Sequence, residues 1–145
     1  MKRGGALASV SDRVGVLDAG AVLARLDRRR RGHATVVDLM DRCRRDVVSL
    51  HVSVVNLAEA LQHAADYTAA TGLDIVTLLA GYHVQLHRPD VQIARRAARL
   101  ATLHDSSLAD RFALATAEAL AARLFTTDAV VAACRGRVRI PITRL

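Results

Sequence analysis

Four acidic residues have the types and positions that a metal-dependent reaction requires. Asp18 and Asp128 each follow a short apolar run, and Glu59 and Asp110 each lie near the start of a predicted helix. Two carboxylates about 5 Å apart repel each other by about 3 kcal/mol at an effective dielectric near 20, so a cluster of four would need a cation. Oxygen ligands without His or Cys favour Mg²⁺ (or Mn²⁺) over zinc.

Each of these acids also has a purely structural interpretation. Asp110 stands three residues after Ser107 and fits a capping box, and Asp128 fits a helix N-cap. Glu59 shares a predicted helical face, typical of a solvated surface, with Asn56, Gln62, His63 and Asp66. Asp18 is the hardest to explain in this way, because an acid that ends an apolar strand must be solvated or paired with a cation. The spacing alone does not show that the four side chains meet.

The elements that would position these acids alternate along the chain. Apolar and β-branched runs predict five strands, at residues 14–17, 47–52, 82–87, 124–126 and 138–142. Amphipathic stretches between them, with capping residues such as Ser53 and Asp90, predict helices. This alternation predicts a three-layer α/β/α domain with a central parallel sheet, whose ligands bind at the carboxyl ends of the strands. Pro141 in the last strand suits an edge position.

The chain of 145 residues fits a single domain, and its 52% of hydrophobic residues suffices for a core. Residues 1–12 are predicted to be a flexible N-terminal tail, and residues 13–145 the folded domain. No apolar run reaches the length of a membrane span, so no membrane association is expected. Cys43 and Cys134 are isolated, which argues against a zinc site or a disulfide and fits a cytoplasmic protein.

The net charge of +7 comes almost entirely from arginine, since Lys2 is the only lysine. It favours a polyanionic partner, or it reflects a general enrichment in arginine. The arginines at positions 28–31 and 42–45 either form a phosphate-binding surface or lie on solvated helix ends. Aromatic residues make up only 3%, which argues against RNA binding by base stacking.

Four segments resemble the motifs of PIN-domain nucleases. Val14–Gly20 resembles their opening strand and first acid, and Ser53–Glu59 resembles their second motif, in which Glu follows Ser by six residues. Ser107–Ala117, together with Leu124–Asp128, looks like the third and fourth acidic motifs of VapC-type toxins. The motifs occur in the family's order, and the resemblance covers residues 13–142.

The resemblance implies a PIN-like fold and an endoribonuclease that uses Mg²⁺ (or Mn²⁺) to cleave RNA, leaving a 3′-hydroxyl and a 5′-phosphate. Asp18 and Asp110 would hold the ion most directly, and Glu59 and Asp128 would complete the site. Thr126 or Thr127 is expected to hydrogen-bond Asp128 or a phosphate oxygen, although Thr127 also fits a helix cap.

The same resemblance implies partners: a cognate antitoxin of a toxin–antitoxin pair that covers the site, and a second copy of the chain in a homodimer. Two alternatives stay open at this point. The chain is a PIN-domain ribonuclease of cellular RNA processing without an antitoxin, or it is a non-catalytic RNA-binding or dimerisation module on the same fold.

Overall fold

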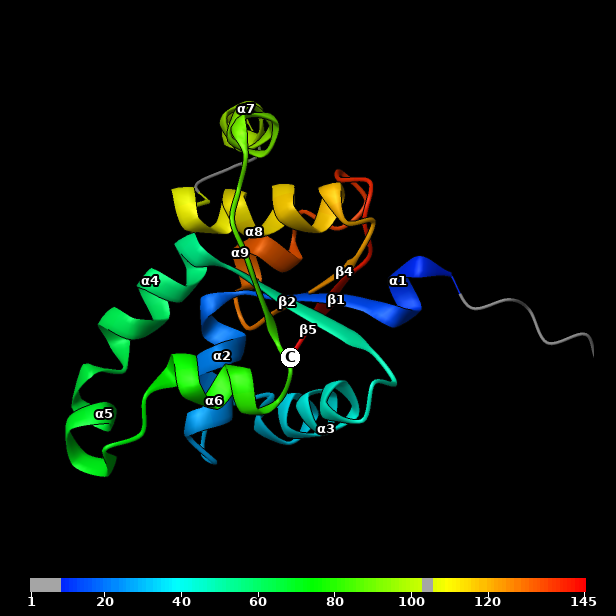
Figure 1. Ribbon diagram of the computed structural model, residues 1–145. Helices are drawn as coiled ribbons and strands as arrows, with labels where there is room; N and C mark the ends of the chain where they lie inside the picture. The colour runs from blue at the N-terminus through cyan, green and yellow to red at the C-terminus, as the bar shows by residue number, and fades with distance from the viewer. Residues whose placement is uncertain (1–8, 103–105) are drawn as a thin grey trace, which may run out of the picture.

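The computed structural model describes residues 9–102 and 106–145, which form a parallel β-sheet between two layers of helices (Figure 1). The sheet has five strands in the order β3-β2-β1-β4-β5. The strands are β1 (Val14–Leu17), β2 (Ser49–Ser53), β3 (Gln85–His87), β4 (Arg123–Thr126) and β5 (Ile142–Arg144). The predicted α/β/α architecture with a central parallel sheet is therefore confirmed.

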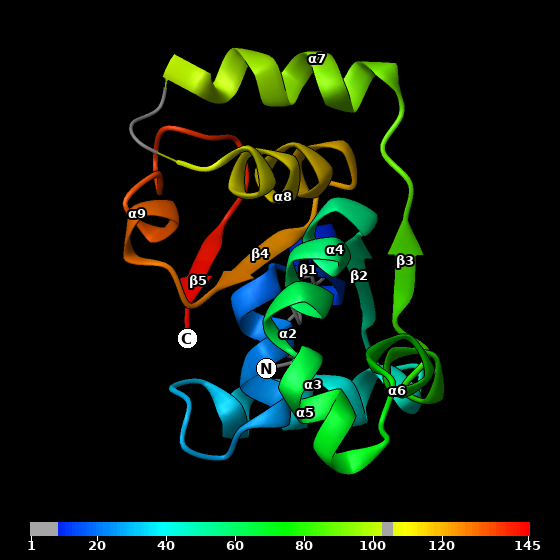
Figure 2. The same cartoon turned by 90° about the vertical axis from the view of Figure 1, so that its left-hand side faces the viewer.

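Each face of the sheet has its own hydrophobic core, because successive residues of a strand point to opposite faces. Val16 packs into one core and Leu17 into the other. One face is covered by α2 (Ala19–Leu26), α3 (His33–Arg44), α4 (Val54–His63) and α6 (Ile75–Gly81). The other face is covered by α7 (Val91–Arg99), α8 (Leu108–Ala119) and α9 (Ala129–Ala132), and Figure 2 shows α7 stacked outside α8.

The strand order creates a crevice beside the central strand. From β1 the chain runs outward through β2 to β3, and it then crosses to β4 on the opposite side of β1. Ligands of open parallel sheets bind where the strand order reverses in this way, at the carboxyl ends of the strands. In this sheet, the loops after β1 and β4 lie at the place where the strand order reverses.

The outer strands are shorter than predicted, for local reasons. His83 has a φ of +60°, which a strand does not allow, so β3 begins only at Gln85. The last strand is Ile142–Arg144 rather than residues 138–142. Pro141 has no N–H to donate and lies just before β5, where its carbonyl accepts from the Leu124 N–H at 3.0 Å. The expected edge position of this segment is correct.

Two further segments differ from the prediction. The helix predicted after the cap Ser53 ends at His63, and α5 (Ala65–Thr71) follows it as a separate helix after Ala64. A short helix, α1 (Val10–Arg13), lies inside the segment expected to be a tail, of which residues 1–8 fall outside the described part of the chain. Leu100–Thr102 adds a 3₁₀ turn after α7. Within the described ranges, no helix has the length and apolarity to cross a membrane.

Candidate active site

Asp18 lies at the carboxyl end of β1, where the chain turns into α2. Its side chain caps that helix, because Oδ1 accepts a hydrogen bond from the Ala21 N–H at 2.8 Å. Its own backbone N–H donates to the carbonyl of Phe125 in β4 at 3.2 Å. The residue is only 4% exposed. Main chain and side chain together hold Asp18 in the crevice between β1 and β4.

The environment of Asp18 opposes its ionisation. Burial raises the pKa of Asp18 from 3.8 to about 6, although hydrogen bonds from the Thr126 hydroxyl and the Ala21 N–H lower it. The negative charges of Asp110 and Asp128 raise the pKa further. Among the described residues, no basic side chain forms an ion pair with Asp18. A bound cation would relieve this combination of burial and like charge.

Asp110 and Asp128 begin the helices α8 and α9. Asp110 Oδ2 accepts from the Ser107 N–H at 2.9 Å, and Ser107 Oγ accepts from the Asp110 N–H at 3.1 Å, which completes the predicted capping box. Asp128 Oδ1 accepts from the Val130 N–H at 2.7 Å, so the predicted N-cap is also correct. Capping uses one oxygen of each carboxylate, and it is therefore compatible with a second role for the other.

Thr126, at the end of β4, connects two of the acids. Its fully buried side chain accepts from the backbone N–H of Asp128 at 2.9 Å through Oγ1. The same hydroxyl donates to the carboxylate of Asp18, which is why it lowers the pKa of that group. The expected hydrogen bond between Thr126 and Asp128 is present, but it involves the main chain of Asp128.

Glu59 lies half-buried in α4, three residues after Asn56, which is buried and not solvated as predicted. Asn56 is fully buried, and its Nδ2 donates to the carbonyl of Ala109 at 3.1 Å. The predicted solvated face is therefore wrong at this position. The bond ties the helix that carries Glu59 to the residue before Asp110. The missed signal is that Asn56 precedes Ala60 by four residues, which places both on the buried side of α4.

All four acids line one cavity of about 210 Å³, which Arg30, His63 and Thr127 also line. Within the described ranges, no three His, Cys, Asp or Glu side chains already form a group able to hold a metal ion. The acids thus share a negatively charged cavity without forming a closed ligand cage.

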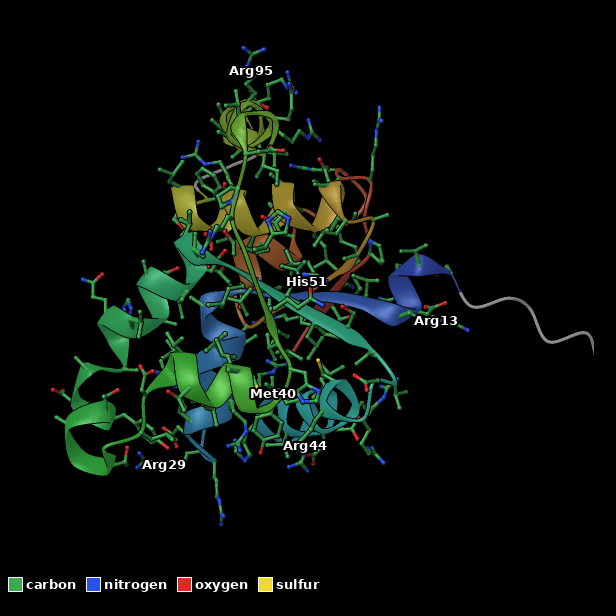
Figure 3. The ribbon with its side chains drawn as sticks, viewed as in Figure 1. Arg13, Arg29, Met40, Arg44, His51 and Arg95 are labelled. Carbon is green, nitrogen blue, oxygen red and sulfur yellow. The ribbon has the colours of Figure 1, made fainter. Side chains whose placement is uncertain are left out.

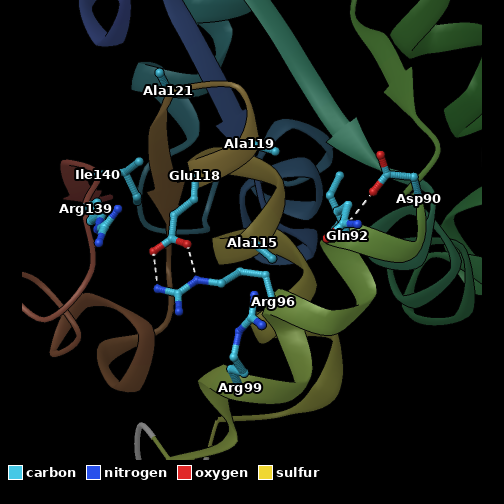
Figure 4. Close-up of a pocket in the computed structure, with 11 residues that line it drawn as sticks. Asp90, Gln92, Arg96, Arg99, Ala115, Glu118, Ala119, Ala121, Arg139 and Ile140 are labelled. Carbon is cyan, nitrogen blue, oxygen red and sulfur yellow. Dashed lines mark hydrogen bonds and ion pairs between the residues drawn. The ribbon is translucent and has the colours of Figure 1, made fainter.

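Two larger hollows lie away from the acids, with volumes of about 670 and 710 Å³. The first lies between α7 and α8, where Arg96 forms a two-pronged ion pair with Glu118 (Figure 4). This pair neutralises its own charges, and the other acid of the hollow, Asp90, caps α7 by accepting from the Ile93 N–H. The second is at the amino ends of the strands, beside Cys43 and Ser49, opposite the crevice. Size alone therefore does not identify the reactive site in this chain.

Comparison with known families identifies the fold. The family model of the PIN domain matches residues 15–135, and this confirms the resemblance drawn from the motifs. No curated protein matches the sequence.

Solved structures similar to this chain include toxin–antitoxin proteins. VapBC2 from Rickettsia felis, bound to a DNA fragment from its promoter, superposes with a TM-score of 0.67 and 11% identity, covering 91% of this chain and 98% of the other. FitAcB from Neisseria gonorrhoeae gives 0.62 and 16%, covering 90% and 96%. VapC20 from Mycobacterium tuberculosis, described as a toxin that cleaves the sarcin–ricin loop, gives 0.61 and 14%, covering 83% and 95%. At such identities the likeness concerns the fold.

Proposed function

This chain belongs to the PIN-domain family, and on that premise we propose that it is a Mg²⁺- or Mn²⁺-dependent endoribonuclease, the toxin of a toxin–antitoxin pair. The observation that carries the proposal is the shared cavity of Asp18, Glu59, Asp110 and Asp128. Its position at the carboxyl ends of β1 and β4 is the position at which parallel sheets bind ligands.

The donor set fits a hard divalent cation. All four candidate ligands are carboxylates, and the most buried of them, Asp18, has no cationic partner among the described side chains. Mg²⁺ usually keeps several of its waters and takes only one or two carboxylates directly. A site in which no three acids converge on one point is therefore compatible with a hydrated ion.

Each residue then has a distinct task. Asp18 and Asp110 would hold the ion most directly, while Glu59 and Asp128 would orient its waters. When bound, the ion would supply water activation and neutralise charge that builds on the scissile phosphate. Thr126 would keep Asp18 oriented, because its hydroxyl donates to that carboxylate while its oxygen is fixed by the Asp128 N–H. Cleavage would leave a 3′-hydroxyl and a 5′-phosphate.

The proposed partners are an RNA substrate, a cognate antitoxin and a second copy of the chain. Support for the antitoxin comes from similar structures that are toxin–antitoxin complexes, including one from Klebsiella pneumoniae with a TM-score of 0.60 and 19% identity. A reading frame for a small protein directly upstream, whose product co-purifies with this chain, would support the toxin assignment. Its absence would favour a processing ribonuclease instead.

The direct test compares purified protein with two aspartate variants on a structured RNA in Mg²⁺ or Mn²⁺. Asp18→Asn is expected to lose cleavage by about 100-fold or more and to bind Mn²⁺ more weakly. Asp74→Asn is the matched control, since Asp74 also caps a helix, α6, but lies outside the cavity. Equal cleavage by all three proteins, or none by any of them, would refute the proposed reaction.

A further inference from the structure

The acid cavity also has a basic side. Arg30 and His63 line it together with the four acids, from the loop between α2 and α3 and from the last residue of α4. RNA is a polyanion, and a cavity lined only with carboxylates would repel it. The placement of the permanently charged Arg30 at this cavity therefore bears on how a substrate is held.

Arg30 differs from the arginines beside it. Of the four consecutive arginines at 28–31, Arg30 is the one that lines the cavity. Its neighbour Arg29 forms an ion pair with Asp27 at 3.1 Å, and Figure 3 labels Arg29 on the loop that follows α2. The described structure records no ion pair or side-chain hydrogen bond for the Arg30 guanidinium. Its five N–H donors remain available for phosphate oxygens.

The backbone of Arg30 is fixed although its side chain is exposed. Its N–H donates to the Asp27 carbonyl at 3.0 Å, and its carbonyl accepts from the His33 N–H at 3.2 Å. Gly32 ends the loop with a φ of +83°, and a Cβ at that position would lie 2.5 Å from Cβ of Leu145. The loop therefore packs against Leu145, which directly follows β5. This packing fixes the position from which Arg30 reaches the cavity.

His63 is oriented by the helix that carries Glu59. Its Nδ1 lies 2.9 Å from the carbonyl oxygen of Glu59. Because a carbonyl only accepts, Nδ1 must carry a hydrogen, and in the neutral ring Nε2 is then an acceptor that cannot donate to a phosphate oxygen. His63 is exposed at the edge of the cavity, so the side-chain N–H donors available to a phosphate there are those of Arg30.

We infer that Arg30 binds a phosphate of the RNA substrate adjacent to the one that is cleaved. The acids and their ion would act on the scissile phosphate, and the guanidinium would hold the neighbouring phosphate and so set the register of the strand. This inference rests on the proposed ribonuclease function, but it concerns a different group of residues and is tested without cleavage.

The test measures binding of a fluorescent single-stranded RNA in EDTA, between about 50 and 200 mM salt. Arg30→Ala is expected to weaken binding by roughly tenfold, and to reduce the slope of log affinity against log salt by about 0.7. Arg29→Ala removes the same charge from the adjacent position outside the cavity, and it should change both quantities much less. Arg30→Lys should recover the salt slope but only part of the affinity.

Mn²⁺ binding separates this inference from the proposed function. Arg30→Ala should bind Mn²⁺ as tightly as the unmodified protein does, whereas Asp18→Asn should bind it more weakly. Equal RNA binding by the Arg30→Ala and Arg29→Ala variants would overturn the phosphate site even if the acids bind Mn²⁺, and so would an absence of RNA binding by the unmodified protein. A selective loss in Arg30→Ala without any Mn²⁺ binding would uphold the phosphate site and overturn the metal site.

Discussion

Asp18 carries a pH dependence that belongs to a single residue. Its folded-state pKa of about 6 lies above the ordinary 3.8, so its contribution to stability is fully present below about pH 4 and is lost as the pH rises through 6. In EDTA, Asp18→Asn should therefore be more stable than the unmodified protein at pH 7, by roughly 2 to 3 kcal/mol. The difference should shrink as the pH falls and level off near pH 4. Urea unfolding across this range measures it.

Asp74 provides the control of opposite sign. Hydrogen bonds from the Thr77 N–H and hydroxyl lower the pKa of Asp74, so its ionised form stabilises the fold. That contribution is present above the unfolded pKa and is lost as the pH falls through the folded one. Asp74→Asn should accordingly lose stability relative to the unmodified protein at neutral pH. The same pH trend in both variants would contradict the account of Asp18.

The contribution of Thr126 to stability should depend on its hydroxyl group rather than on the shape of its side chain. Thr126→Val keeps the volume but leaves the Asp128 N–H without its acceptor and removes one of the two hydrogen bonds to the Asp18 carboxylate. We expect a loss of about 2 kcal/mol in the free energy of unfolding and a further rise in the pKa of Asp18, because a lowering hydrogen bond is removed. Thr126→Ser retains both bonds and should lose less than about 1 kcal/mol. Unfolding curves for the two variants decide the matter, and equal losses would count against the bridging role.

At the level of elements, the sequence predicts best where a segment is long and capped. The helices begun by Asp90 and Ser107 start as expected, because each cap is a local interaction between residues three positions apart. The outer strands were predicted less well. The alternation at residues 82–87 contains no sign that His83 adopts a left-handed backbone, which is decided by the turn after α6.

For the site as well, the local positions of residues were easier to predict than their convergence in space. Asp110 and Asp128 occupy the caps that their neighbours predict, whereas Asp18, expected to be solvated or paired with a cation, is a buried N-cap that was not predicted. That they share a cavity with Glu59 depends on the crossing of the chain from β3 to β4, and neither periodicity nor spacing contains that information. The family resemblance provided the expectation that the residues converge.

Gly20 is the point at which α2 meets the loop after β4. A Cβ on Gly20 would lie 2.0 Å from Oγ1 of Thr127 and 3.3 Å from its Cβ, so Gly20→Ala must displace a side chain that lines the cavity. We expect Gly20→Ala to lower both stability and cleavage. In a Thr127→Ala background the oxygen at 2.0 Å is gone and only the Cβ at 3.3 Å remains, so the same change should stabilise the helix, by at most about 0.5 to 1 kcal/mol. A double-mutant cycle in unfolding free energy measures this reversal of sign, and additive effects would rule out the contact.

For the molecule as a whole, the last residue joins parts that lie far apart in the sequence. The Leu145 N–H donates to the Thr126 carbonyl at 2.8 Å, and its buried side chain packs against Gly32 at the end of the loop that carries Arg30. The loop beside the cavity and the strand that ends at Thr126 therefore share one anchor.

Leu145→Ala should weaken that anchor on the side of the loop, because the main-chain bond from the Leu145 N–H to Thr126 does not depend on the side chain. We expect a loss of about 2 kcal/mol in unfolding free energy, from lost burial and the space left behind. Faster amide exchange is expected in residues 27–32, because the loop loses the side chain it packs against. Arg144→Ala, which removes an exposed side chain from the preceding position at the end of β5, should stay within about 0.5 kcal/mol. Hydrogen exchange read by mass spectrometry measures the loop directly. Unchanged exchange there, despite a lower stability, would mean that the loop holds its shape without Leu145.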